Sequence, residues 1–329
     1  MNFKILRTAR ALGFLVAIAI PDRWAAAQSD SPHHPPVISF SQSLAVEGGT
    51  LQIDFAEGEL DLPRAELIQR IGSAAHAVAV YYGRFPVARA RVLVVPVAGA
   101  HGVLQGTTWG NRSGFQAFLR LHIGQSTSRD ELASDWVITH ELVHTALPSL
   151  PGDQHWLEEG IASYIEPIAR VQAGQLSAAK IWADMMNGMP NGEPGPRDRG
   201  LDITHTWGRT YWGGALFCLI AEVEIRKETG NRRGLQDALR AIVAAGGSID
   251  KEWSIQRVLS IGDQATGTQV LEKMYAQWSV TPVFVDLPQL WTQLGIRADP
   301  RGIVFDASAP LAEIRTSVAN PSTSSDPRK

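Results

Sequence analysis

Cysteine is almost absent from this sequence of 329 residues, with Cys218 as its one example. A single cysteine excludes an internal disulfide framework and any metal cluster built on several thiolates. Cys218 lies within the apolar run 215–220, and these surroundings predict a small buried thiol rather than a nucleophile. The chemistry of the protein therefore has to come from other side chains.

An excess of positive charge is also missing. The chain has 30 lysine and arginine residues against 33 aspartate and glutamate residues, a formal net charge of −3, so it offers no basic field for nucleic acid. The sequence has neither a Walker loop nor a strand–GxGxxG–helix unit, so no motif supports a phosphate-binding or dinucleotide-binding site. With 44% hydrophobic and 19% charged residues, the composition is that of a globular protein.

The N-terminus has the pattern of a secretory signal peptide. Basic residues within the first ten positions precede an apolar stretch, 11–20, and small residues stand at 25–27. This pattern predicts a signal peptide over residues 1–27 and export to the periplasm or beyond the cell. Its removal would change the formal net charge from −3 to −6. No later stretch is apolar enough to span a bilayer, and an uncleaved anchor is the alternative.

The rest of the chain predicts an α+β fold with a strand-containing first part and a helical second part. We expect a linker over 28–36, an N-terminal α/β lobe over 37–130, a helical lobe over 131–310 and a mostly disordered tail over 311–329. The tail prediction rests on residues from Asn320 onward, which include no apolar side chain.

Hydrophobic periodicity predicts the elements of both lobes. The first lobe should hold a β-hairpin turning at Gly48-Gly49, a helix and two strands, with the glycine-rich stretch 102–114 joining the strands. These elements are the hairpin 37–55, the helix 62–82 and the strands 91–97 and 115–123. The helices expected in the second lobe are 131–147, 156–165, 210–229, 234–245 and 266–279.

Catalytic chemistry is concentrated in the segment His140-Glu141-Leu142-Val143-His144. Two histidines four residues apart on a helix face the same point, so both imidazoles can bind one Zn²⁺ ion. Glu141 lies about 100° around the helix from His140. From there it can act on a water molecule as a general base without occupying a ligand position.

A third zinc ligand has to come from outside this segment. The three-histidine version of the motif would need glycine and histidine where Leu147 and Leu150 stand, so it is excluded. The next helix offers Glu158 and Glu159, and Glu159 is the better candidate. It shares a helix face with Gly160. Because glycine is small, we expect it to let this helix approach the metal helix, the one that carries His140 and His144.

Glu166 and His205 are open cases. Glu166 follows Glu159 by seven residues on the same helix face, and it could orient a ligand histidine through the second ring nitrogen. Equally, it could be an exposed acid at the helix end before Pro167. His205 is a weak candidate for a donor to an oxyanion, and a loop histidine without a role is the simpler interpretation.

The segment 140–144 and the sequence Trp-Leu-x-Glu-Gly-x-Ala-x-Tyr-x-Glu that follows it at 156–166 form a pattern. This pattern resembles the gluzincin metallopeptidases of the thermolysin clan, in particular their glycyl-aminopeptidase-like branch. The segments 211–216 and 222–230 resemble later motifs of that branch. The resemblance implies a thermolysin-like helical lobe and one zinc ion held by two histidines and a glutamate. The residues that carry these implied roles are His140, His144 and Glu159 as ligands, Glu141 as general base and Tyr211 as the donor that stabilises the oxyanion.

Two features differ from what the resemblance implies: the first removes a charge near the site, and the second bears on specificity. Gly213 replaces the lysine of its Tyr-x-Lys-Gly motif, and the segment 87–129 includes no aspartate or glutamate. Exopeptidases of the clan hold the free amine of the substrate with an acidic residue in this region. Five arginines stand there instead, and one of them could hold a carboxylate, although ordinary surface arginines explain them as well.

The sequence therefore predicts an exported zinc peptidase that hydrolyses peptide bonds, with the strand 115–123 as the edge against which an extended peptide pairs. The alternative is a non-catalytic, zinc-containing module that binds peptides or serves as a scaffold. The natural substrate, endo- or exopeptidase action and the oligomeric state stay open.

Overall fold

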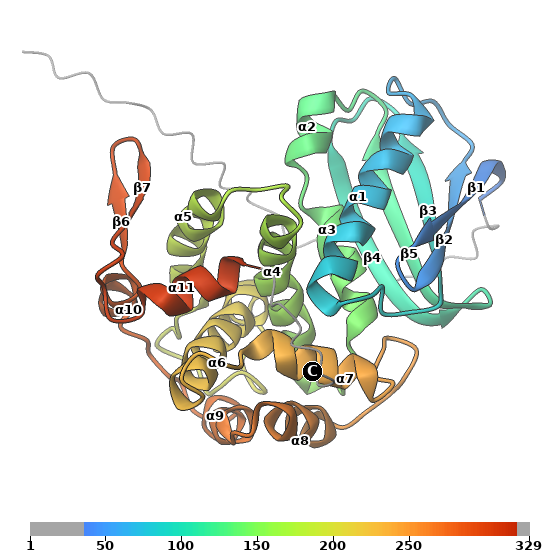
Figure 1. Ribbon diagram of the computed structural model, residues 1–329. Helices are drawn as coiled ribbons and strands as arrows, with labels where there is room; N and C mark the ends of the chain where they lie inside the picture. Colours follow the sequence, from blue (N-terminus) through green and yellow to red (C-terminus); the bar gives the residue numbers. More distant parts are fainter. Residues whose placement is uncertain (1–35, 321–329) are drawn as a thin grey trace, which may run out of the picture. The chain divides into compact units, whose positions relative to one another are not determined.

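The computed structural model describes residues 36–320, and the predicted signal peptide and almost all of the predicted linker lie outside them. Its first part is a five-stranded sheet in the order β1-β2-β3-β5-β4 (Figure 1). The three inner strands are parallel, and both edge strands run antiparallel to their neighbours. The strands are β1 (Ile38–Val46), β2 (Gly49–Ala56), β3 (Arg89–Val97), β4 (Val103–Arg112) and β5 (Phe115–Gly124).

The position of β5 corrects the predicted peptide-pairing edge. Residues 115–123 form a strand as expected, but β5 lies between β3 and β4, so its backbone is already paired on both sides. The edge strand on this side of the sheet is β4, inside the glycine-rich stretch that we expected to be a connection. Glycine weakens a strand in isolation, but here Gly106 and Gly110 let β4 approach other parts of the chain. A Cβ atom at Gly110 would lie 2.7 Å from the carbonyl carbon of Ile249.

One face of the sheet is covered by helix α1 (Arg64–Tyr82), which Figure 1 shows crossing it. Alternate residues of the inner strands are fully buried, including Ile53, Val92 and Leu119, and Leu67 and Ile71 of α1 belong to the same hydrophobic cluster. The same cluster extends into the helical part, so the predicted boundary at residue 130 does not separate two cores. The fold class predicted from the sequence, α+β, is confirmed.

The second part is mainly helical, and among residues 36–320 no helix is both long and apolar enough to cross a membrane. A π-helical turn, Gly208–Gly213, leads directly into α6. The helices are α2 (Arg129–Ser134), α3 (Val137–Val143), α4 (His155–Gln172), α5 (Ala178–Gly188), α6 (Gly214–Glu228), α7 (Leu235–Ala244), α8 (Ile255–Thr266), α9 (Val270–Trp278), α10 (Leu287–Gln293) and α11 (Ala312–Ala319), with a short hairpin of β6 (Ile296–Asp299) and β7 (Gly302–Phe305) between the last two.

The predicted helix 131–147 is broken in two. Asp135 follows α2 in an extended conformation, and its carboxylate accepts hydrogen bonds from the backbone N–H groups of Val137 and Ile138 at 3.1 and 3.0 Å. A carboxylate at this place satisfies free N–H groups in the first turn of α3. The break therefore gives the motif helix its own well-defined start.

The tail prediction was wrong for residues 312–319. They form α11, whose Ile314 and Val318 pack into the hydrophobic cluster. The error arose because the polar composition after Asn320 was extended too far toward the N-terminus. Residues 321–329 lie outside the described part of the chain.

Candidate metal centre

Helix α3 brings the two histidines of the motif together. His140 lies in the middle of α3 and is buried, and His144 begins a short 3₁₀ turn, His144–Ala146, directly after the helix. The centroids of the two imidazole rings are 4.9 Å apart. Two histidines at this spacing face one point, as the sequence pattern predicts.

Glu159 completes the cluster from α4. Its Oε2 atom lies 3.1 Å from Nε2 of His140 and 3.6 Å from Nε2 of His144. One potential ligand atom from each of these three residues lies within 4.8 Å of the other two. Glu158 points elsewhere: its carboxylate accepts a hydrogen bond from the backbone N–H of Leu150 and contacts His155. The structure thus places the expected carboxylate, that of Glu159, beside the two histidines, and it does not place that of Glu158 there.

Charge and chemistry at this cluster fit a zinc ion. Burial by itself would lower the pKa of His144, but the carboxylate of Glu159 outweighs it and raises that pKa to about 9. Burial likewise opposes ionisation of Glu159, yet the imidazoles of His144, His140 and His155 hold its pKa well below the usual range. The imidazoles and the carboxylate thus stabilise one another's charged forms, and a Zn²⁺ ion between them would supply the positive charge in place of the imidazole protons. Two imidazole nitrogens and one carboxylate oxygen are a donor set typical of catalytic zinc sites.

Glu141 is held by the edge strand β4. The Thr108 hydroxyl lies 2.7 Å from Oε2 of Glu141 and 2.9 Å from its backbone carbonyl, and it can donate a hydrogen bond to either oxygen. At Gly106, an added Cβ atom would lie 2.7 Å from Cδ of Glu141. The carboxylate is buried against the strand, adjacent in sequence to His140 but outside the cluster of possible ligand atoms.

Tyr211 lies in the π-helical turn before α6, with its ring stacked on that of His140 at a centroid distance of 6.2 Å. Burial, followed by the charges of Glu159 and Glu141, raises the pKa of its hydroxyl well above the ordinary value. The hydroxyl is therefore a neutral donor beside the cluster. His205 is exposed and its Nε2 donates to the backbone carbonyl of Asp202 at 2.9 Å, so the structure gives it no contact with the cluster.

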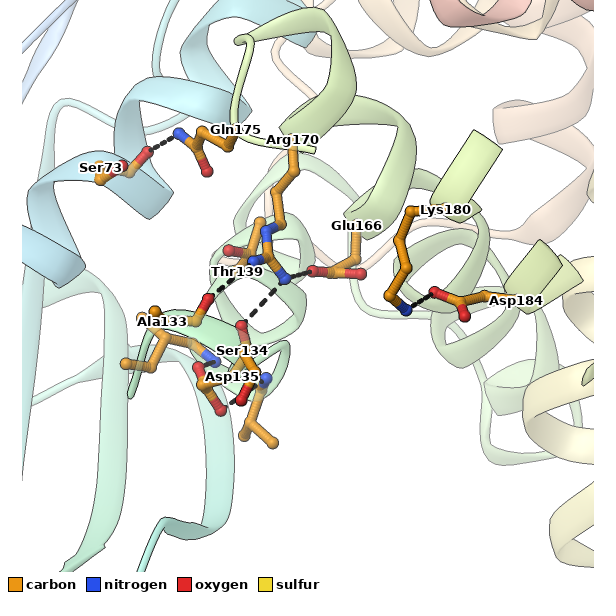
Figure 2. A network of polar contacts seen from close by, with 12 residues as sticks. Ser73, Ala133, Ser134, Asp135, Thr139, Glu166, Arg170, Gln175, Lys180 and Asp184 are labelled. Atoms are coloured by element: carbon orange, nitrogen blue, oxygen red, sulfur yellow. Dashed lines mark hydrogen bonds and ion pairs between the residues drawn. The ribbon is translucent and has the colours of Figure 1, made fainter. Parts of the chain in front are cut away.

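Glu166 fits neither sequence interpretation. It is buried rather than exposed, and α4 continues through Pro167 to Gln172. Its Oε1 accepts a hydrogen bond from Arg170 at 2.9 Å (Figure 2), and Nδ1 of His140 has no hydrogen-bond partner among the described residues. Burial raises the pKa of Glu166, although the guanidinium of Arg170 counteracts part of that rise. Glu166 therefore belongs to an ion pair.

Arg170 of this ion pair also joins α4 to the backbone just before α3. Arg170 Nη1 also donates to the backbone carbonyl of Asp135 at 2.9 Å, and Nη2 donates to that of Ala133 at 3.2 Å (Figure 2). Arg70 of α1 donates to the same Asp135 carbonyl at 2.7 Å. The break between α2 and α3 is thereby fixed to α4, the helix that carries Glu159.

Gly160 has a different contact from the one we expected. A Cβ atom there would lie 2.8 Å from the carbonyl oxygen of Gly214, so Gly160 permits close approach of α4 to α6 rather than to the metal helix. The close approach predicted from a mid-helix glycine exists, but the partner helix was wrong.

The five arginines of the acid-free segment contact other groups. Arg89, Arg91, Arg112 and Arg120 lie over aromatic rings on β4 and β5, and Arg129 pairs with Glu66. Arg91 also pairs with Asp54 at 2.6 Å. None of these contacts is with the metal cluster.

The sequence interpretation missed Thr108 and His155. Thr108 lies 33 residues before Glu141 in a stretch without local motif, and only the strand pairing reveals its contact. His155 lies on α4 with Nε2 3.3 Å from Oε1 of Glu159 and Nδ1 2.7 Å from Glu158. Its position four residues before Glu159 on a predicted helix was a usable signal.

Comparison with known proteins supports the fold. No protein-family model matches the sequence, and no curated protein matches it. An aminopeptidase N family protein from Idiomarina loihiensis is similar in structure, with a TM-score of 0.58 and 12% identity, over 82% of this chain and 53% of that one. Two structures of a two-domain M1 zinc metallopeptidase, with bound L-arginine or L-tryptophan, have TM-scores of 0.50 at 15% and 17% identity. They match over 76% of this chain and 53% of theirs.

The chain therefore has the fold of M1-type zinc peptidases and spans about half the length of these structures. The finer resemblance, to the glycyl-aminopeptidase-like branch, stays a prediction.

Proposed function

We propose that this protein is a zinc-dependent peptidase of the gluzincin type. The observation that carries the proposal is the convergence of His140, His144 and Glu159 beside the separately held carboxylate of Glu141. A zinc ion that only stabilised the fold would have no use for a base positioned in this way. The solved structures with the same fold include an M1 zinc metallopeptidase, which supports the same class of reaction.

In this proposal His140, His144 and Glu159 hold one Zn²⁺ ion, which when bound supplies Lewis acidity toward water and the substrate carbonyl. Glu141 accepts a proton from the attacking water and then returns it to the amine that leaves. The Tyr211 hydroxyl, held neutral by its surroundings, donates a hydrogen bond to the oxyanion as negative charge develops there. Hydrolysis of a peptide bond is the reaction that this combination serves.

Export is part of the proposal and rests on the N-terminal sequence pattern alone, because residues 1–35 lie outside the described part of the chain. A peptidase secreted through this signal would act in the periplasm or outside the cell.

The substitution Glu141→Gln tests the proposal. It removes the base but retains the shape of the side chain, so the variant should bind one zinc ion as the wild type does. Its rate of peptide hydrolysis should fall by about 10²–10⁴-fold. Metal content and cleavage of a mixed peptide library, with and without a chelator, provide the two readouts.

Glu224→Gln is the matched control, since Glu224 is a partly exposed acid on α6 that pairs with Lys227. This variant should keep both zinc and full activity. A wild-type protein that binds zinc and cleaves no peptide would instead favour the non-catalytic peptide-binding module.

A further inference from the structure

Two tryptophans beside the metal cluster remain exposed. Trp136 and Trp207 expose 52% and 55% of their surface, whereas most large apolar side chains among residues 36–320 are buried. Exposing an indole forgoes the stabilisation that burial of its large apolar surface would give. A single exposed apolar residue is ordinary, so the contacts of these two decide whether they matter.

Each exposed indole touches a ring of the candidate site. Trp136 meets His140 edge to face with ring centroids 5.3 Å apart, and Trp207 stacks on Tyr211 at 5.8 Å. Because His140 and Tyr211 themselves stack at 6.2 Å, the rings form the series Trp136, His140, Tyr211, Trp207. The inner two members carry the proposed chemistry, and the outer two present apolar surface to solvent on either side of them.

Both tryptophans are attached to firmly held backbone. Trp136 precedes α3, directly after the Asp135 carboxylate that caps this helix. Trp207 precedes the π-helical turn, and the next residue but one, Arg209, is buried in an ion pair with Asp198 at 2.7 Å. A rigid aromatic surface that is already in place loses little entropy on binding, which makes it an effective contact for a ligand.

We propose that Trp136 and Trp207 select peptides with a bulky apolar side chain, aromatic above all, at a residue that flanks the cleaved bond. This inference rests on the proposed function and adds the substrate class. Stacking and apolar burial against an indole favour a planar, apolar side chain over a small or charged one. The position next to His140 and Tyr211 places that side chain beside the bond under attack.

The test compares wild type, Trp136→Ala and Trp207→Ala, each loaded with zinc, on a mixed peptide library. We expect the wild type to cleave next to Phe, Tyr, Trp or Leu in preference to Ala or Asp. Each alanine variant should lose about 10- to 100-fold in kcat/KM on an aromatic peptide, mainly through KM, and little on an alanine peptide. Trp136→Phe and Trp207→Phe should recover most of the preference.

Binding without turnover gives a second readout. A zinc-loaded Glu141→Gln protein should bind a Phe-containing peptide at least about tenfold more tightly than its Ala counterpart. Adding either tryptophan-to-alanine substitution should abolish that difference. Phe284→Ala is the matched control because Phe284 is 71% exposed and is an aromatic residue outside the ring series; it should change neither measurement.

Failure of the tryptophan assignment and failure of the proposed peptidase function give different results. A wild-type profile without preference for bulky apolar residues, or a preference that survives in both alanine variants, overturns the assignment of the tryptophans and leaves the peptidase proposal intact. Absence of peptide cleavage by the zinc-loaded wild type overturns the proposed function and this inference with it.

Discussion

Glu141 reaches its buried position through contacts with an edge strand distant in sequence. Thr108 supplies a hydroxyl 2.7 Å from its carboxylate, and Gly106 supplies the space in which its side chain lies. The carboxylate is thus oriented before any substrate arrives, and a pre-oriented group is what proton transfer in the transition state requires. Sequence spacing selects Glu141 as the proposed base, and its contacts with β4 explain how its carboxylate is oriented.

A substitution at Thr108 tests this account at the scale of one residue. Thr108→Val keeps the shape and removes the donor, so kcat should fall by about 10- to 100-fold, the equivalent of one hydrogen bond to a charged group. Thr108→Ser keeps the donor and should restore most of the rate. Steady-state kinetics and zinc content check this, and equal losses in the two variants at unchanged zinc content would count against a positioning role for the hydroxyl.

At the scale of elements, the ligand-bearing helices α3 and α4 depend on a buried polar network for their relative position. Arg170 is hydrogen-bonded to Glu166 on its own helix and to backbone carbonyls of Ala133 and Asp135 before α3. Breaking a buried pair from one side leaves an uncompensated charge, which is far more costly than losing an exposed pair.

Two alanine variants, one at Arg170 and one at Lys180, distinguish the loss of a buried ion pair from the loss of an exposed one. Arg170→Ala should lower the free energy of unfolding by about 3–5 kcal/mol. Lys180→Ala, which removes the exposed Lys180–Asp184 pair of α5 shown in Figure 2, should change it by no more than about 0.5 kcal/mol. Denaturant titration followed by circular dichroism measures both, and an Arg170→Ala protein as stable as the lysine variant would refute the importance of the network.

Much of the element pattern follows from the sequence, and the exceptions have physical reasons. Periodicity predicted the first hairpin, α1, β3 and β5, because each buries one apolar face. Periodicity missed β4 because glycines at 106 and 110 do not favour a strand locally. These glycines give room to Glu141 and Ile249, which approach them from distant parts of the chain. Periodicity joined α2 and α3 because the extended conformation of Asp135 depends on capping and on Arg70 and Arg170.

In the candidate site, too, some features could be predicted from the local sequence and others depend on contacts with distant segments. Spacing selected His140 and His144, since ligands on a helix follow a fixed geometry, and the helix face shared with Gly160 together with the family resemblance selected Glu159. The contacts of Thr108, the hydrogen bonds from Arg170 to the carbonyls of Ala133 and Asp135, and the stacking of Tyr211 on His140 link segments that local sequence rules cannot relate. Long-range packing decides these features, and a motif carries no information about it.

At the scale of the whole molecule, the sheet-bearing and helical parts share one hydrophobic cluster and together hold the proposed site. The proposed base, Glu141 of α3, is hydrogen-bonded to β4, two of the proposed ligands come from α3 and the turn after it, and the third comes from α4. The chain corresponds to about half the length of the M1-type structures that resemble it. The residues to which the proposed chemistry is assigned all lie within the described part of the chain.

Zinc content after exhaustive dialysis, determined by mass spectrometry on folded wild type, Glu159→Ala and Glu158→Ala, tests the central claim most directly. The account predicts one zinc ion per chain in the wild type and in Glu158→Ala, and almost none in Glu159→Ala, because Glu159, unlike Glu158, faces the two imidazoles. A full complement of zinc in Glu159→Ala, or its loss in Glu158→Ala alone, would contradict the account.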